Sequence, residues 1–198
     1  GEGVARYQGF TVFVDGAIPG DEVLAQIVQV KRNYARARML EIIRPAPHRV
    51  PPRCPVFGRC GGCQLQAMAY PEQLRWKTRL VADALARIGR LGDVVVHDAL
   101  GAPQPWHYRT KALFPVGRAP RGEGVVVGLY ARGTHRIVEV AECPVQHPVN
   151  NEILAAAREL IARYRYAPYD ETTGTGLVRH LLARTGAATG QAMAGVVV

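Results

Sequence analysis

The sequence predicts an α+β protein, in which a small amino-terminal β-barrel is followed by a mixed α/β domain. Three observations favour this fold class. Residues 1 to about 45 carry only strand and turn signals, a proline-rich stretch follows at residues 44–52, and two later segments repeat apolar residues at helical spacing among short strands. The chain of 198 residues, 48% of them hydrophobic, can bury one sizeable core or two smaller ones. We therefore expect two domains, residues 1–46 and residues 47–198.

Three β-rich runs separated by turns make up the first domain. They cover residues 10–14, 23–30 and 34–43. The motif Ile18-Pro19-Gly20-Asp21 predicts a turn between the first two, because Pro presets one turn dihedral and Gly accepts a positive φ. So many short strands with Gly and Pro turns in so few residues favour a small closed barrel of the oligonucleotide-binding type.

A basic stripe follows the last of these strands. The two-residue period of a strand places Arg32, Tyr34, Arg36 and Arg38 on one side. A cationic face with an aromatic ring can hold phosphates and stack a base. An ordinary solvated strand face would show the same alternation, so the pattern by itself leaves both interpretations open.

The charge of the chain points to a polyanionic partner. Its formal net charge is +9, from 25 Lys and Arg against 16 Asp and Glu, and nucleic acid is the leading candidate. A general preference for arginine in the source proteome is the alternative. The apolar runs are far shorter than the roughly 20 residues that cross a bilayer, and no charged-then-apolar leader precedes Gly1. We therefore expect a cytoplasmic protein with no membrane partner and no disulfides.

The second domain opens on a linker and a helix. Prolines without amide donors prevent residues 44–52 from propagating a helix or a central strand. Helical periodicity then predicts a helix over residues 71–88, which Gly89 ends and which needs a partner for one face. Its apolar positions are Leu74, Val81, Leu85 and Ile88.

Short strands and a second helix complete the chain. Residues 125–130 and 134–140 predict a hairpin, and residues 177–184 and 191–198 predict two more strands, the last of them cut short so that the domain is incomplete at its carboxyl end. Between these pairs, Asn150 and Asn151 can cap a helix that ends before Pro168. The expected apolar stripe of this helix is Ile153, Ala157, Leu160, Ile161 and Tyr164.

The four cysteines have the spacing of a metal site. Cys54, Cys60 and Cys63 lie close together and Cys143 is remote. Four thiolates fit either a structural zinc ion or an iron-sulfur cluster. The three-plus-one arrangement, with proline directly after Cys54 and Cys143, favours a 4Fe-4S cluster over zinc. Four unrelated buried thiols are the third interpretation.

Several motifs occur in the order found in a known enzyme family. They are the segment Cys54-Pro55-Val56-Phe57-Gly58-Arg59-Cys60-Gly61-Gly62-Cys63-Gln64-Leu65-Gln66, then Gln73-Leu74-x-x-Lys77, Tyr108-Arg109-Thr110-Lys111, Cys143-Pro144-Val145-Gln146 and Gly176-Leu177-Val178-Arg179-His180. In these motifs the chain resembles the bacterial 23S rRNA (uracil-5-)-methyltransferases, and its start, through Ile18-Pro19-Gly20-Asp21, resembles a TRAM domain, a small RNA-binding barrel. It departs from the family pattern at Thr110, where Asn is usual.

The resemblance implies cofactors and a partner. It implies that Cys54, Cys60, Cys63 and Cys143 bind a 4Fe-4S cluster in an iron-sulfur central domain, that S-adenosylmethionine donates the methyl group, and that 23S rRNA is bound. The expected RNA contacts are Arg32, Tyr34, Arg36, Arg38, Arg109 and Lys111. Arg179 and His180 match a family motif too, but neighbours on a strand point to opposite faces.

The resemblance also implies where the chemistry takes place. In this family a cysteine thiolate adds to carbon 6 of a uracil that has left its stack, and a carboxylate base later removes the carbon 5 proton, both in a carboxy-terminal α/β domain. This sequence has no Gly-rich loop between a strand and a helix, and no cysteine remains once four bind a cluster. We therefore expect a fragment without catalytic or S-adenosylmethionine-binding residues, which binds RNA and a cluster as a monomer.

Two other functions fit the same sequence. One is a stand-alone RNA-binding module with a structural zinc or iron-sulfur site. The other is an electron-transfer iron-sulfur protein, which the basic charge disfavours because an electron carrier needs no nucleic-acid face. The choice between ribosomal and transfer RNA, and of a particular uridine, depends on RNA folding and on contacts spread over a whole enzyme.

Overall fold

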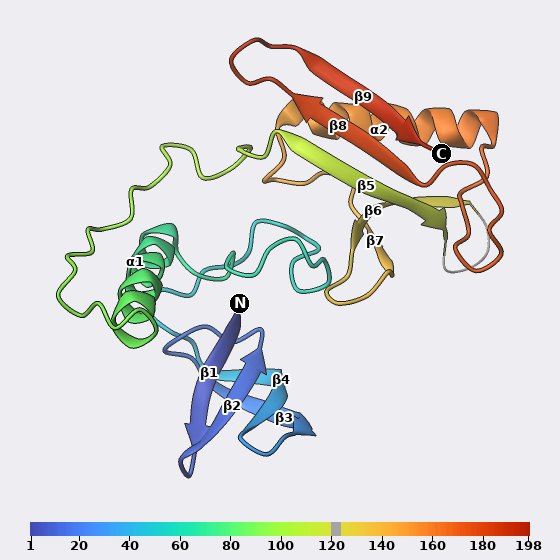
Figure 1. Cartoon of the computed structure of the whole chain (residues 1–198). Coiled ribbons are helices and arrows are strands. Elements are labelled where there is room, and N and C mark those ends of the chain that lie inside the picture. Colours follow the sequence, from blue (N-terminus) through green and yellow to red (C-terminus); the bar gives the residue numbers. More distant parts are fainter. Residues whose placement is uncertain (120–123) are drawn as a thin grey trace. The chain divides into compact units, whose positions relative to one another are not determined.

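The computed structural model describes residues 1–119 and 124–198 and divides the chain into two compact units (Figure 1). Unit 1 comprises Gly1–Arg53 and Cys63–Ala102, and unit 2 comprises Cys54–Gly62 and Pro103–Val198. The elements in order are β1 (Glu2–Tyr7), β2 (Phe10–Asp15), β3 (Glu22–Val30), β4 (Tyr34–Arg44), α1 (Tyr70–Arg87), β5 (Lys111–Arg118), β6 (Val125–Tyr130), β7 (Ile137–Glu139), α2 (Pro148–Tyr164), β8 (His180–Thr185) and β9 (Ala192–Val197). The mixture of helices and sheets confirms the α+β class.

Unit 1 contains an open four-stranded sheet rather than the closed barrel that we expected. Its strand order is β1-β2-β4-β3, so β1 and β3 form the two edges. β1 and β2 are antiparallel, β2 and β4 are parallel, and β3 and β4 are antiparallel. Closure would require the edge strands to pair along a staggered register around an interior filled by side chains, and four strands enclose little such space. All three runs expected from the sequence are strands, while β1 was missed.

Small apolar side chains fill the inner face of this sheet. Val12 and Val14 from β2 lie with Ala35 and Ala37 from β4 in one buried cluster. Strand alternation explains why these four residues are buried together, because they share one face of two neighbouring strands. The residues between them therefore point to the opposite, outer face.

The proline-rich segment after β4 is anchored to this sheet by Asp21, whose side chain is 1% exposed. The carboxylate accepts hydrogen bonds from the backbone N–H groups of Ile18 (2.8 Å) and Ala46 (3.0 Å) and from the guanidinium of Arg49 (2.7 Å from Nη2). Burial alone would raise the pKa of Asp21, but the hydrogen bonds from Arg49, Ala46 and Ile18 outweigh it and lower the pKa below 3.8. The expected turn at Asp21 thus also fixes the start of the linker.

The helix α1 agrees with the helix expected over residues 71–88. Proline in its first turn lacks the N–H that a helix start leaves unpaired, and Gly89 donates its N–H to the carbonyl of Ala84 at the end. No residue of α1 is buried, and Val81 and Ile88 are exposed at 52% and 85%. The apolar face that we expected to be covered is therefore only partly covered, because Leu74 and Leu85 are half-buried. No helix among the described residues combines the length and the apolar character needed to span a bilayer.

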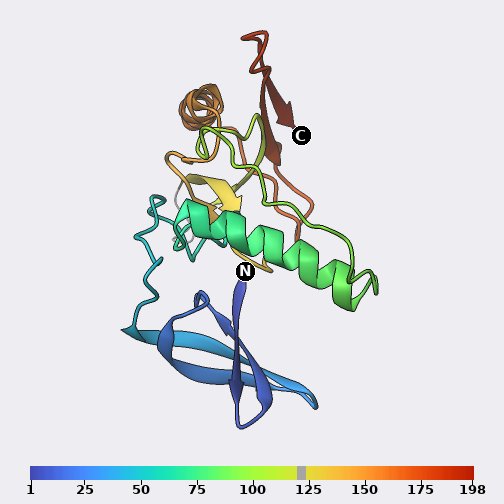
Figure 2. The same cartoon turned by 90° about the vertical axis from the view of Figure 1, so that its left-hand side faces the viewer.

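Unit 2 is a five-stranded antiparallel sheet of order β7-β6-β5-β8-β9 with α2 on one face (Figure 1), and Figure 2 views this helix nearly end-on beside the strands. Phe114 from β5 and Leu154 from α2 are fully buried in the core, with Val127 1% exposed. The expected hairpin is formed by β6 and β7, and the expected final strands are β8 and β9.

The sequence did not predict β5, because it contains Pro115. Residues from Lys111 to Pro115 pair with β8, whereas Val116 and the two residues after it pair with β6. The proline lies where the strand changes partners. Its missing N–H therefore interrupts neither ladder.

The start and the buried face of α2 differ from the prediction. His147 is the N-cap, and its Nδ1 accepts a hydrogen bond from the N–H of Val149 at 3.4 Å. Pro148 begins the helix since its fixed φ suits the first turn, so Asn150 and Asn151 lie inside the helix and do not cap it. Leu154, absent from the expected stripe, is fully buried.

The stripe itself is correct only in part. Ile161 is buried, and Ile153 and Ala157 pack against the core. Leu160 and Tyr164 are exposed at 51% and 57%. The sheet sets which side of the helix is buried, and the helical period alone does not.

Candidate nucleic-acid interface and metal site

The outer face of β4 presents the residues of the expected basic stripe. Ala35 and Ala37 are each 3% exposed on the inner face. The alternating residues Tyr34, Arg36 and Arg38 therefore lie on the outer face, where the arginines are exposed and the tyrosine is half-buried. Arg32 lies before β4, in the connection from β3, and is not part of the strand.

Phe13 of β2 extends this surface, and the sequence reasoning missed it. It lies opposite Arg36 in the parallel pairing of β2 with β4. Its ring is 5.5 Å from the ring of Tyr34, with an angle of 84° between the planes. The alternation of Val12, Phe13 and Val14 could have placed Phe13 on the outer face. We call Phe13, Tyr34, Arg36 and Arg38 the aromatic-basic face.

Neighbouring side chains hold the two arginines of this face in position. Arg36 donates to the carboxylate of Glu2 on β1 at 2.7 Å, and Arg38 donates to the side-chain oxygen of Gln26 on β3 at 3.2 Å. Both contacts are on the surface, where such pairs contribute about 0–1 kcal/mol. The guanidinium groups are therefore oriented by the sheet and remain accessible to an anion.

The two other expected RNA contacts lie in unit 2. Arg109 uses its backbone rather than its side chain for anchoring, since its N–H donates to the carbonyl of Val145 at 2.8 Å and its carbonyl accepts from the N–H of His147 at 2.8 Å. Lys111 is the exposed first residue of β5 and lies directly opposite Arg184 of β8.

Cys54 and Cys60 lie in one loop, which contacts the turn between β6 and β7 at Cys60 and Gly61. Cys60 forms an isolated bridge with Ala131, and the N–H of Gly61 donates to the carbonyl of Tyr130 at 2.9 Å. A Cβ at Gly61 would lie 3.1 Å from that same carbonyl oxygen, which explains the glycine. The N–H of Gly62 approaches the Sγ of Cys60 at 3.3 Å, so the backbone here turns toward a cysteine sulfur.

Cys143 is buried and is fixed to the first turn of α2. Its N–H donates to the side-chain oxygen of Asn151 at 3.0 Å, and its carbonyl accepts from the side-chain nitrogen of the same residue at 3.2 Å. Asn151, expected as a helix cap, therefore holds the backbone of a cysteine instead.

A buried polar network adjoins this segment. Asn150 donates to the side-chain oxygen of Gln146 at 3.0 Å and accepts from the hydroxyl of Thr185 at 2.8 Å.

The donor set fits a thiolate-bound metal centre by its chemistry. No disulfide joins the four cysteines. Cys54, Cys60 and Cys143 belong to unit 2, whereas Cys63 belongs to unit 1. Within residues 1–119 and 124–198, no three His, Cys, Asp or Glu side chains are grouped as metal ligands. The chain therefore contains four thiols, the number that a 4Fe-4S cluster requires.

Two residues of the last family motif have separate surroundings, in agreement with opposite orientations. The guanidinium of Arg179 lies 3.7 Å from the centre of the Tyr169 ring, a cation–π contact. The Nε2 of His180 lies 3.4 Å from the hydroxyl of Tyr130. Burial, followed by the charge of Glu171, raises the pKa of Tyr130 above 10.0.

Comparisons with known proteins agree with these features. A profile of the TRAM domain matches residues 1–40, which confirms the TRAM-like start. An uncharacterized RNA methyltransferase of Halalkalibacterium halodurans is 42% identical over 193 residues, covering 98% of this chain and 42% of that protein. Another, from Gloeobacter violaceus, is 44% identical over 192 residues, covering 96% of this chain and 42% of that protein.

A solved structure has the same fold. It is a Pyrococcus abyssi tRNA (uracil-54, C5)-methyltransferase in complex with S-adenosyl-L-homocysteine, with a TM-score of 0.73 and 22% identity over 98% of this chain and 45% of that one. The chain is thus similar to RNA methyltransferases over nearly its full length, and it spans about 42% of the length of the curated relatives it matches.

Proposed function

We propose that this chain is the RNA-recognition part of an S-adenosylmethionine-dependent RNA uracil-5 methyltransferase that acts on 23S rRNA. The aromatic-basic face carries the proposal, since two rings and two arginines lie together within the residues that match a TRAM domain. Arginines neutralise phosphates, and rings stack on bases of any sequence. The net charge of +9 favours the same partner.

The relatives support the reaction class. Those reported above carry the name RNA methyltransferase, and the structural neighbour acts on carbon 5 of a uracil and binds S-adenosyl-L-homocysteine, the product of a methyl transfer. We assign methyl transfer to the whole protein and no catalytic residue to these 198 residues. Incubation of this chain with RNA and radiolabelled S-adenosylmethionine should leave the RNA unlabelled, and labelled 5-methyluridine would overturn the assignment.

RNA binding by the chain is the primary test. Fluorescence anisotropy with a labelled single-stranded fragment of 23S rRNA, repeated over a series of salt concentrations, gives both the affinity and its salt dependence. Each phosphate contact in a single-stranded complex contributes about 0.7 to the slope of log K against log salt. Losing one contact therefore lowers the affinity about fivefold at 0.1 M salt. Arg38→Ala should lower the slope and the affinity by about these amounts.

The aromatic part of the face needs its own variants. Tyr34→Leu should weaken binding by about fivefold or more, because a stacked base contributes about 1–3 kcal/mol. Tyr34→Phe keeps the ring and should bind like wild type. Arg87→Ala, which removes an exposed charge from α1 in the same unit, is the matched control. Wild-type affinity in both Arg38→Ala and Tyr34→Leu would refute the proposed interface.

The identity of the RNA is tested by competition. Unlabelled transfer RNA should displace the labelled 23S fragment less effectively than the same unlabelled fragment does. Stronger displacement by transfer RNA would reverse the substrate assignment and leave the binding surface in place.

We also propose that Cys54, Cys60, Cys63 and Cys143 bind a 4Fe-4S cluster, supported by their number and by their thiol chemistry. Its role would be structural, because methyl transfer from S-adenosylmethionine moves no net electrons. Anaerobic purification should give brown protein with about four irons per chain, and Cys143→Ala should lose the colour. Stoichiometric zinc without iron would overturn the cluster.

A further inference from the structure

The sheet of unit 2 has a second face, opposite to α2, that carries an unneutralised pair of cations. Lys111 and Arg184 lie directly opposite each other on the antiparallel strands β5 and β8, and both are exposed. Like charges at such positions repel and destabilise a sheet. Throughout the described part of the chain, neither side chain takes part in an ion pair or hydrogen bond. An anionic ligand would relieve this repulsion.

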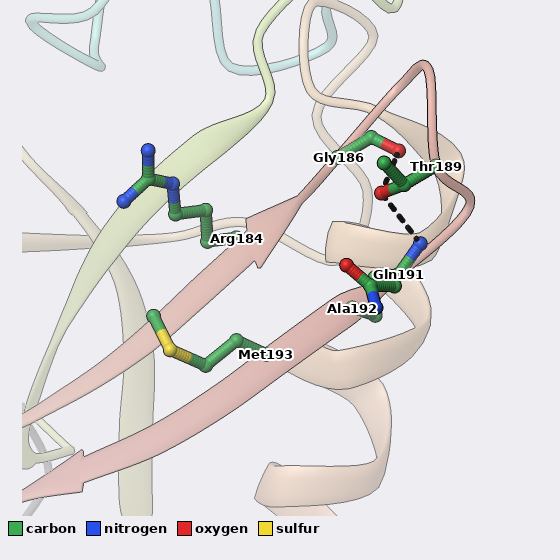
Figure 3. Close-up of a pocket in the computed structure, with 6 residues that line it drawn as sticks. All are labelled: Arg184, Gly186, Thr189, Gln191, Ala192 and Met193. Carbon is green, nitrogen blue, oxygen red and sulfur yellow. Dashed lines mark hydrogen bonds between the residues drawn. The ribbon is translucent and has the colours of Figure 1, made fainter.

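A pocket adjoins the pair at the tip of the β8–β9 hairpin (Figure 3). Its volume is about 410 Å³, within the range of small-molecule sites. The lining residues are Arg184, Gly186, Thr189, Gln191, Ala192 and Met193. They combine a guanidinium, a hydroxyl and an amide with the apolar side chain of Met193, which lies opposite Arg184 in the strand pairing.

The hairpin loop that lines this pocket is held in shape by its own hydrogen bonds. The carbonyl of Gly186 accepts from the N–H groups of Thr189 (3.1 Å) and Gly190 (2.8 Å), and the N–H of Gly186 donates to the carbonyl of Gln191 at 2.8 Å. The hydroxyl of Thr189 lies near this turn as well, 3.4 Å from the N–H of Gln191. Contacts within the chain therefore fix the loop that lines the pocket.

We propose that this pocket and the cation pair bind one nucleotide of a single-stranded RNA. The phosphate lies between Lys111 and Arg184, and the sugar and base occupy the pocket against Met193, with the hydroxyl and amide of Thr189 and Gln191 available to polar edges. Charge complementarity selects RNA as the occupant, because the pair carries two positive charges beside an open pocket of about 410 Å³. The inference rests on the proposed function, in which Lys111 is already an expected RNA contact, and it adds Arg184 and the pocket of the β8–β9 hairpin to that contact.

The test uses the same anisotropy assay on the full chain. Arg184→Ala should lower the affinity about fivefold at 0.1 M salt and reduce the salt slope by about 0.7, as expected for one lost phosphate contact. Arg163→Ala, which removes an exposed charge from α2, should match wild type. Lys111→Glu separates folding from binding, since it creates an opposite-charge pair with Arg184. Its urea midpoint should stay the same or rise while RNA affinity falls.

A positive readout comes from crosslinking. RNA carrying 4-thiouridine should crosslink on irradiation to the peptide that contains Gln191 and Met193, and Arg184→Ala should reduce the yield. Wild-type affinity in both Arg184→Ala and Lys111→Glu, or equal losses in Arg163→Ala, would overturn this site. If these variants bind normally while Arg38→Ala is impaired, only this inference fails. If wild type binds no RNA, the proposed function fails with it.

Discussion

Replacing Asp21 with Ala should unfold the sheet of unit 1 far more readily while leaving unit 2 intact. The carboxylate is the common acceptor for the N–H groups of Ile18 and Ala46 and for the guanidinium of Arg49. Its removal leaves those donors without their partner in a place where the Asp21 side chain is 1% exposed and that of Arg49 15%. The linker after β4 would also lose its anchor.

The magnitude follows from the burial of the pair. Removing one partner of a buried ion pair costs about 3–5 kcal/mol. Arg49 keeps some access to water and a second acceptor, the carbonyl of Gly16 at 2.9 Å, so we expect the lower end, about 3 kcal/mol. That is a large share of the roughly 5–15 kcal/mol that stabilises a typical domain.

Hydrogen exchange followed by mass spectrometry measures this change locally. A loss of about 3 kcal/mol should speed exchange of the most protected β2 and β4 amides by about a hundredfold, since 1.36 kcal/mol corresponds to a factor of ten. Peptides from β5 and β8 serve as the internal control. An acceleration of less than tenfold, or one shared equally by β5, would refute the reasoning. Asp21→Ala combined with Arg49→Met should cost less than the sum of the single changes.

The same pair predicts a pH dependence. The pKa of Asp21 is lowered in the folded protein, so its contribution to stability is complete above pH 3.8 and declines as the pH falls through the folded-state value. In wild type, protection of β2 and β4 should therefore fall below pH 3.8. Asp21→Asn has no carboxylate to protonate, so it should not show this loss of protection below pH 3.8.

Three further predictions concern unit 2. Leu154→Ala should lower the stability of unit 2 by about 2–5 kcal/mol in urea denaturation, because Leu154 is fully buried against the sheet; a cost below 1 kcal/mol would contradict this packing. Gly128→Ala should prevent β6–β7 pairing, since a Cβ would lie 1.9 Å from the carbonyl oxygen of Val138. A soluble variant with wild-type hydrogen-exchange rates in both strands would contradict this prediction. Asn151→Ala should speed exchange around Cys143 by about tenfold, for two lost backbone hydrogen bonds, whereas Glu152→Ala in the same helix turn should not.

The sequence predicted elements well where the signal is local. The helix over residues 71–88 and the strand over residues 125–130 agree with α1 and β6 to within one residue, because periodicity, proline and glycine act through neighbouring residues. The strand β1 has little apolar alternation, and β5 contains Pro115, so neither could be recognised without its pairing partners. The N-cap of α2 was missed because a histidine takes the place of the expected asparagines.

The candidate site also combines residues that a local pattern predicts with residues that only strand pairing brings together. Tyr34, Arg36 and Arg38 share a face because alternation along a strand is local, and the sequence alone places them together. That Phe13 joins them depends on the parallel pairing of β2 with β4, which connects residues 23 positions apart. The opposition of Lys111 and Arg184 joins residues even further apart in the chain.

By itself the sequence determined the α+β class, the basic character and the likeness to RNA methyltransferases, because composition, period and motif order are properties of the chain read in one dimension. The tertiary structure decided that the first sheet is open, that Asn151 holds Cys143, and that two cations meet unneutralised beside a pocket. Each of these depends on which distant segments pair. Strand register and helix docking set that pairing through the burial of side chains that no local window contains.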